Sequence, residues 1–271
     1  MLAADGFFSR QALGDFGFRW LHILAGITWI GLLYYFNVVQ VPAFAKFEDE
    51  PHKEIGGKAR LVAIDKVARK ALWWFRWSAL ATFLTGLMIT GIVKGYYTND
   101  VLLDADGAVA GWGTIAGNVG ISTGIMLGTI MMLNVWGVIW RNQKVVLANA
   151  ATVLAGGEPN PAAAAAGRKA VMASRQNMIF SVTMLFFMLF KSHHPASSTV
   201  LEGSDLGIYW MVTLLIVGIM EINALGLLPW KTTANKGLNA MYDGPGVRNP
   251  LIAAGGMFVV FLILTEIFFV G

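Results

Sequence analysis

Histidine is the side chain best suited to bind a haem iron, and the first of the four, His22, lies early in a long apolar stretch. Gly26 follows four residues later and Trp29 three residues after that, so the three residues share one face of a helix. A glycine one turn from a histidine leaves room for a flat macrocycle, with Trp29 packing on its edge. The spacing predicts a haem-ligand helix. The alternative is a buried histidine hydrogen-bonded to another helix, with Gly26 serving close helix packing.

Two adjacent histidines, His193 and His194, end a second apolar stretch, because Pro195 cannot continue a helix. If alternate stretches cross a membrane in opposite directions, these histidines and His22 lie near the same face. We therefore expect a haem b with two axial histidines, His22 and His193. His194 is the fallback, and Met188 is a further axial candidate.

Two acidic residues, Glu221 and Glu266, stand alone in apolar stretches. Ionisable groups inside a membrane are costly and are functional candidates by default. Each carboxyl could relay protons or pair with a base such as Arg19. The alternative is a neutral carboxyl that holds two helices together through a hydrogen bond.

Other kinds of chemistry are excluded by what the sequence lacks. The absence of cysteine excludes disulfides, thiolate metal sites, cysteine nucleophiles and covalently attached c-type haem. No zinc-protease, P-loop or dinucleotide-binding motif is present. No residue is therefore assigned a catalytic role. His52, in a charged connector, is expected to be a surface residue.

The elements that must position these residues are long apolar helices. Hydrophobic residues make up 56% of the 271 residues and charged residues only 13%, about half the usual charge of a soluble domain. A helix needs about 20 apolar residues to cross a bilayer. We predict one all-α membrane domain over residues 1–271, with about six spans at 17–41, 72–94, 116–140, 171–190, 206–228 and 250–270.

The lysines and arginines predict the orientation of these spans. Sixteen of the 20 fall on three alternate connectors, and this bias marks the cytoplasmic side. Both termini are then outside, on the periplasmic side of a bacterial inner membrane. The basic residues on the cytoplasmic connectors account for the net charge of +4, so nucleic-acid binding is not expected.

The cytoplasmic connectors are predicted to extend the helices. Residues 56–70 place apolar residues at helical spacing among basic ones, which is typical of an amphipathic helix on the membrane surface. Residues 142–155 are expected to continue the third span, and residues 162–170 to begin the helix that leads into the fourth.

Several of these segments resemble the membrane domain of the bacterial membrane-bound urate oxidase (urate hydroxylase) family. The resemblance covers the first four spans and is carried by residues 19–22 (RWLH), 29–31 (WIG), 134–136 (NVW), 139–144 (IWRNQK), 174–177 (SRQN), 184–188 (MLFFM) and His193. It implies a membrane domain that oxidises a small molecule and passes electrons to a cytochrome c. Full-length members carry a C-terminal cytochrome c domain. This chain has no cysteine, so we expect its electron acceptor to be a separate cytochrome c or a respiratory-chain component.

The sequence therefore predicts a redox protein embedded in the lipid bilayer, with haem b as its cofactor. The rival hypothesis is a non-catalytic accessory or structural subunit of a membrane electron-transfer complex, in which His22 only forms a hydrogen bond.

Overall fold

The computed structural model describes residues 13–47, 53–92, 112–244 and 246–270, and the regular structure in these ranges is helical except for one isolated bridge between Ile115 and Val200. The α-helices are α2 (Phe18–Tyr34), α3 (Val41–Lys46), α4 (Lys53–Ala63), α5 (Arg69–Ile92), α6 (Ala116–Asn134), α7 (Trp140–Leu154), α8 (Ala163–His193), α9 (Gly203–Ala224) and α10 (Arg248–Thr265). The π-helical segments η2 (Tyr35–Gln40) and η6 (Val135–Ile139) join α2 to α3 and α6 to α7. Two more, η4 (Ile64–Ala68) and η9 (Glu266–Val270), join α4 to α5 and end α10. The all-α prediction is confirmed for the described residues.

Four helical runs among the described residues are long and apolar enough to cross a membrane: Phe18–Lys46, Ala116–Leu154, Gly203–Ala224 and Arg248–Val270. They contain the third and sixth predicted spans whole, the first except for residue 17, and the fifth as far as residue 224. Helices α5 and α8 lie at the second and fourth, but both are more polar. Arg69, Lys70 and Arg76 lie in the first half of α5, and α8 carries Arg168, Lys169 and the polar residues 174–177. Helix α9, at the fifth predicted span, ends at Ala224, four residues before the predicted end. Residues 93 and 94, at the end of the second predicted span, lie outside the described ranges.

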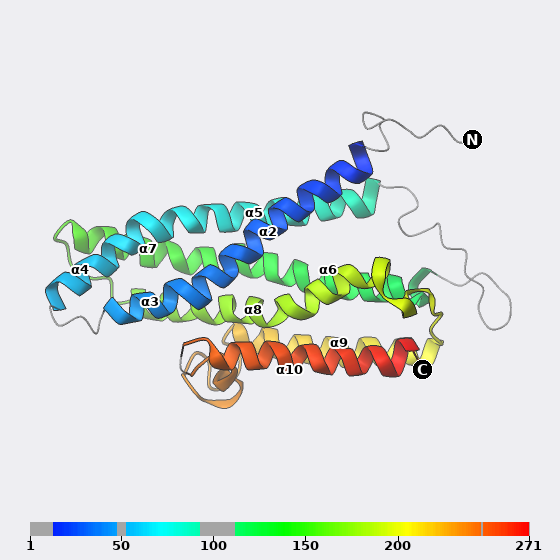
Figure 1. Cartoon of the computed structure of the whole chain (residues 1–271). Helices are drawn as coiled ribbons and strands as arrows, with labels where there is room; N and C mark the ends of the chain where they lie inside the picture. The colour runs from blue at the N-terminus through cyan, green and yellow to red at the C-terminus, as the bar shows by residue number, and fades with distance from the viewer. Residues whose placement is uncertain (1–12, 48–52, 93–111, 245, 271) are drawn as a thin grey trace.

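The predicted helical extensions are present. Residues 142–154 continue α6 through α7, one residue short of the predicted end. Residues 163–170 form the start of α8, one residue after the predicted start, and α8 runs unbroken into the fourth predicted span. The predicted amphipathic segment is formed by α4 and η4, which lead directly into α5. These segments gather at one end of the molecule (Figure 1).

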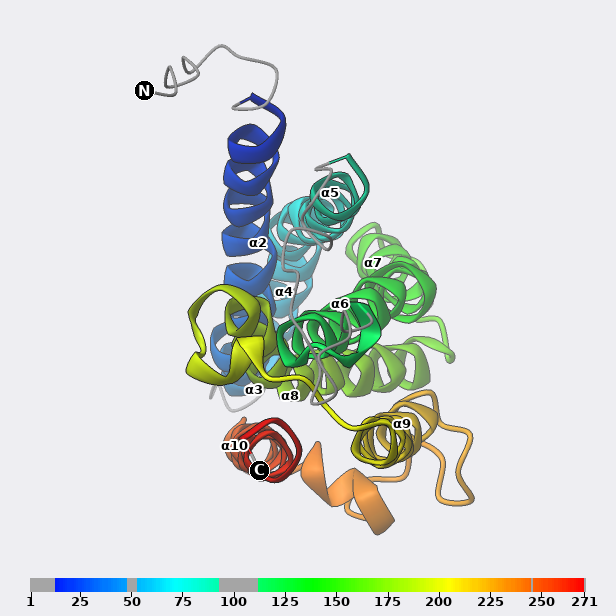
Figure 2. The same cartoon turned by 90° about the vertical axis from the view of Figure 1, so that its right-hand side faces the viewer.

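The long helices lie in antiparallel pairs. Helix α2 packs along α5, and α6 packs along α8 (Figure 1). Helices α9 and α10 lie on the other side of α8 from α2 and α5 (Figure 2). The first pair diverges from the second toward the end at which α2 begins (Figure 1).

Glycines on α6 explain its close approach to α8. A Cβ at Gly120 would lie 2.7 Å from the ring of Phe190, and one at Gly124 would lie 3.3 Å from the backbone of Phe187. Small residues at such crossings let two backbones pack closely, which is how helices associate when lipid surrounds them. The α6–α8 pair is therefore the closely packed centre of the bundle.

The outer surface of the bundle is far more apolar than that of a soluble protein, and the interior contains polar side chains within a hydrophobic core. Exposed faces of the long helices carry large apolar side chains, among them Met211, Leu214, Leu215, Ile252, Val259 and Ile263. The interior holds amides and hydroxyls, among them Asn118, Thr123, Asn134, Gln176, Asn177 and Asn223. Water would disfavour so large an exposed apolar surface, whereas lipid accommodates it.

The connector between α9 and α10 folds back against α8. Arg168 donates two hydrogen bonds to the carboxylate of Asp243, at 2.5 and 3.0 Å, and a third to the carbonyl of Thr232 at 3.0 Å. About two turns further along α8, Arg175 donates to the carbonyls of Tyr242 and Gly246. These two arginines fix the connector to the helix.

Candidate functional site

A cavity of about 560 Å³ lies between the two diverging helix pairs. This volume falls within the range of about 300–1,000 Å³ usual for ligand sites. Its wall is formed by side chains of α2, α5, α6 and α8 and is mostly apolar. The few side chains in it that could bind a metal or form hydrogen bonds are those of Arg19, His22, Trp29, Thr82, Thr90, Thr129, Met184, Met188 and Ser192.

His22 lies in this wall with one ring nitrogen already engaged. Its Nδ1 is 2.8 Å from the carbonyl oxygen of Thr82 and 3.2 Å from the hydroxyl of Thr85. Because a carbonyl can only accept, Nδ1 carries the proton and donates it to Thr82. Nε2 is then the nitrogen with a free lone pair. Histidines that ligate metals usually have this arrangement, in which a second nitrogen bonded to a carbonyl fixes the ring.

Gly26 and Trp29 line the same cavity, as their shared helix face predicts. Trp29 is 3% exposed, and its indole N–H has no hydrogen-bond partner within the described part of the chain. A buried N–H without a partner is costly, and it suits a site whose ligand brings an acceptor. On α5, Gly86 lies against His22, since a Cβ there would be 3.2 Å from the imidazole Cε1.

The structure does not bring His193 and His194 into this cavity. His193 is the last residue of α8 and is exposed. The ring of His194 stacks on Phe190 at 4.3 Å, and its Nδ1 accepts a hydrogen bond from the backbone N–H of Ala196. The predicted pairing of His22 with His193 is therefore not seen, because α8 presents Met184 and Met188 to the cavity instead.

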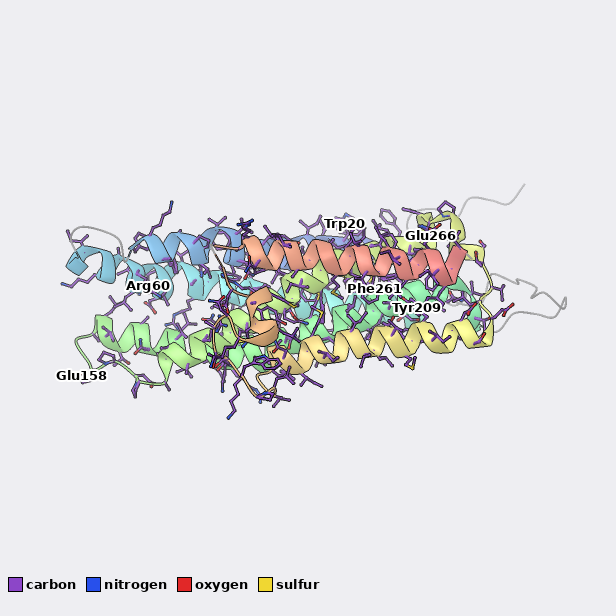
Figure 3. The ribbon with its side chains drawn as sticks, turned by 90° about the horizontal axis from the view of Figure 1, so that it is seen from below. Trp20, Arg60, Glu158, Tyr209, Phe261 and Glu266 are labelled. Carbon is purple, nitrogen blue, oxygen red and sulfur yellow. The ribbon has the colours of Figure 1, made fainter. Side chains whose placement is uncertain are left out.

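The two acidic candidates also lie away from the cavity. Glu221 of α9 accepts a hydrogen bond from Asn134 of α6 at 3.1 Å. The same amide donates to Asn177 of α8, which in turn donates to the carbonyl of Met131. This network ties three helices together, as the hydrogen-bond alternative proposed. Glu266 is exposed near the end of α10 (Figure 3).

Within residues 13–47, 53–92, 112–244 and 246–270, no three His, Asp or Glu side chains form a group that could hold a metal ion. Side chains alone therefore do not provide a metal centre in these ranges. A metal at His22 would need further ligands from a cofactor such as a porphyrin. The residues present fit haem b in three respects: an imidazole with a free nitrogen, an apolar cavity of suitable volume, and an indole donor without a partner.

Sequence reasoning missed the contribution of α5. Thr82, Thr85 and Gly86 surround the His22 ring, yet each is a common residue in an apolar helix. Their spacing of three and four residues places them on one helix face, and this was the available signal.

Comparison of the chain with models of protein families, with curated proteins and with solved structures gave no match. The resemblance to membrane-bound urate oxidases therefore rests on the segments quoted above. The function has to be argued from the cavity and its residues.

Proposed function

We propose that this chain is a membrane-embedded redox protein that holds haem b in the cavity between α2, α5, α6 and α8. In this proposal it oxidises a small molecule and passes electrons to a separate cytochrome c or to the respiratory chain. The observation that carries the proposal is His22, whose Nδ1 is bonded to the Thr82 carbonyl while its Nε2 is free, in the wall of a 560 Å³ apolar cavity.

The membrane setting is supported by the large apolar side chains on the exposed faces of the bundle. Six spans follow if α5 and α8 cross together with the four apolar helical runs. Each packs lengthwise against one of those runs, α5 against α2 and α8 against α6. Helix α8 is buried over much of its length, and a helix enclosed by others can carry more polar residues than one that faces lipid.

The orientation follows from where the basic connectors lie. Lys66, Arg69, Arg141 and Lys144 belong to the segments gathered at one end of the bundle, which we assign to the cytoplasm. α2 begins and α10 ends at the other end (Figure 1). That end is then periplasmic, and the cavity is near it, within reach of a soluble cytochrome c.

In this site the protein positions and insulates the cofactor. Haem b, when bound, supplies a one-electron couple. His22 provides the ligand nitrogen, and Thr82 fixes the ring through its carbonyl and keeps the proton on Nδ1. The apolar walls exclude water. The indole N–H of Trp29 is available to an acceptor on the cofactor or on a substrate beside it.

The accessory-subunit hypothesis has one observation in its favour. The bond from His22 to Thr82 is also what a purely structural histidine would form to hold α2 against α5. The two hypotheses differ in the visible spectrum. We expect the protein, purified from membranes in mild detergent, to show the reduced-minus-oxidised bands of a b-type haem and to yield haem b on extraction. A colourless protein that also fails to take up added haemin would contradict the proposal and favour the accessory role.

A further inference from the structure

We propose that Met188 is the second axial ligand of the haem, facing His22 across the cavity; this inference rests on the proposed haem function. The cavity wall offers two kinds of side-chain atom that bind haem iron in proteins, imidazole nitrogen and thioether sulfur. His22 supplies the first. The second comes from Met184 and Met188, both on α8.

Helix register selects Met188 over Met184. Four of the cavity-lining residues of α2 follow one another inward about one turn apart: Arg19, His22, Gly26 and Trp29. Helix α8 runs in the opposite direction, and three of its lining residues follow inward at the same spacing, Ser192, Met188 and Met184. Two hydrogen bonds set the register of these antiparallel helical runs, one between Tyr34 and Ser181 and one from Asn37 to Ser174. Stepping outward from them by equal numbers of residues brings His22 level with residues 189–193 of α8, so Met188 is the nearer of the two methionines and Met184 lies one turn deeper.

The surroundings of the two methionines agree with this choice. Met184 is 5% exposed and belongs to the packed core of the bundle. Met188 is only partly buried, at the edge of that core. The methyl end of Met188 lies beside Gly128 of α6, where a Cβ would be 3.7 Å away. An unbranched thioether with three rotatable bonds can turn toward a bound group without disturbing the core.

The histidines at the end of α8 are poorly placed to compete. His194 is held by stacking on Phe190 and by a hydrogen bond from Ala196. His193 is exposed one residue before it and does not line the cavity. A ligand set of one histidine and one methionine raises the reduction potential of a haem relative to two histidines. Such a haem accepts electrons more readily from an organic substrate.

The test uses the full chain with haem bound and compares Met188→Leu with the matched control Met184→Leu. We expect wild-type ferric protein to be low-spin, with the far-red charge-transfer band of a methionine-ligated haem. Met188→Leu should lose that band, become high-spin and bind carbon monoxide when reduced. Met184→Leu and His193→Ala should keep the wild-type spectrum. Met188→His should return a low-spin spectrum with a lower midpoint potential, which shows that the site still folds.

Each other result counts against a specific claim. A Met188→Leu protein that keeps the wild-type low-spin spectrum overturns the inference and leaves the proposed function standing. Loss of the low-spin form in His193→Ala but not in Met188→Leu restores the pairing of two histidines. A wild-type protein that binds no haem b overturns the inference together with the proposed function.

Discussion

Replacing Gly86 by alanine probes the proposed haem site without removing any of the proposed ligands. The new Cβ would lie 3.2 Å from Cε1 of His22 and 3.5 Å from its Nδ1, and ordinary contacts begin at 3.4 Å. The imidazole must therefore move by a few tenths of an ångström. The imidazole cannot do so freely, because its Nδ1 donates a hydrogen bond to the carbonyl of Thr82, which lies one turn before Gly86 on α5. The methyl group pushes the ring away from α5 while the hydrogen bond holds it there.

The size of the effect follows from that conflict. Overpacking of this kind costs about 1–3 kcal/mol, and disturbing the group that orients a metal ligand lowers affinity roughly 10–100-fold. We expect Gly86→Ala to bind haem about tenfold more weakly, equivalent to about 1.4 kcal/mol. Titration of haem-free protein with haemin, followed by absorbance, measures this. Gly218→Ala is the matched control, since a Cβ at that position would have no other atom within 4 Å. Wild-type affinity and spectrum in Gly86→Ala would refute the assignment of His22 to the iron.

Three further predictions concern the connectors and the buried network. Burial alone would raise the pKa of Asp243, but two hydrogen bonds from Arg168, one from the backbone N–H of Asn235 and the charges of Arg168 and Arg175 together outweigh it, so that pKa is lowered. Its contribution to stability is then present above about pH 4, the unfolded value, and is lost as the pH falls through the lowered pKa. The difference in melting temperature between wild type and Asp243→Asn should accordingly shrink below pH 4, and a constant difference would contradict this. Reporter fusions after Asn160 and Ser198 should signal cytoplasm and periplasm respectively, and the reverse would overturn the orientation. Glu221→Gln should leave the haem spectrum unchanged and melt within a few degrees of wild type if the carboxyl only accepts from Asn134; a changed midpoint potential would reinstate a proton-relay role.

The helices could be predicted from sequence because long apolar runs and breakers are local signals. The unbroken helix from Ala163 to His193 and the continuation of the third span through α7 were both predicted. The end of α9 was placed four residues too late, because residues 225–228 are apolar although Gly226, with φ of 73°, terminates the helix.

The cavity face of α2 was predictable for the same reason, since helical spacing alone places His22, Gly26 and Trp29 together. The faces that α5, α6 and α8 contribute to the cavity could not be predicted. Which face α8 turns toward α2 depends on its close packing with α6 through Gly120 and Gly124, and that contact joins residues far apart in the sequence. The shared depth of His22 and His193 was inferred only from their positions along the predicted spans. It could not show that the end of α8 turns both of its histidines away from the cavity.

The most direct test of the central claim is the reduced-minus-oxidised spectrum of His22→Ala, recorded alongside wild type before and after addition of imidazole. The account predicts that wild type shows low-spin haem b bands and that His22→Ala loses them. Added imidazole should restore them, because the substitution leaves space for that molecule beside Gly86 and Thr82. A His22→Ala protein that keeps an unaltered low-spin spectrum would show that His22 only packs α2 against α5, and would contradict the account.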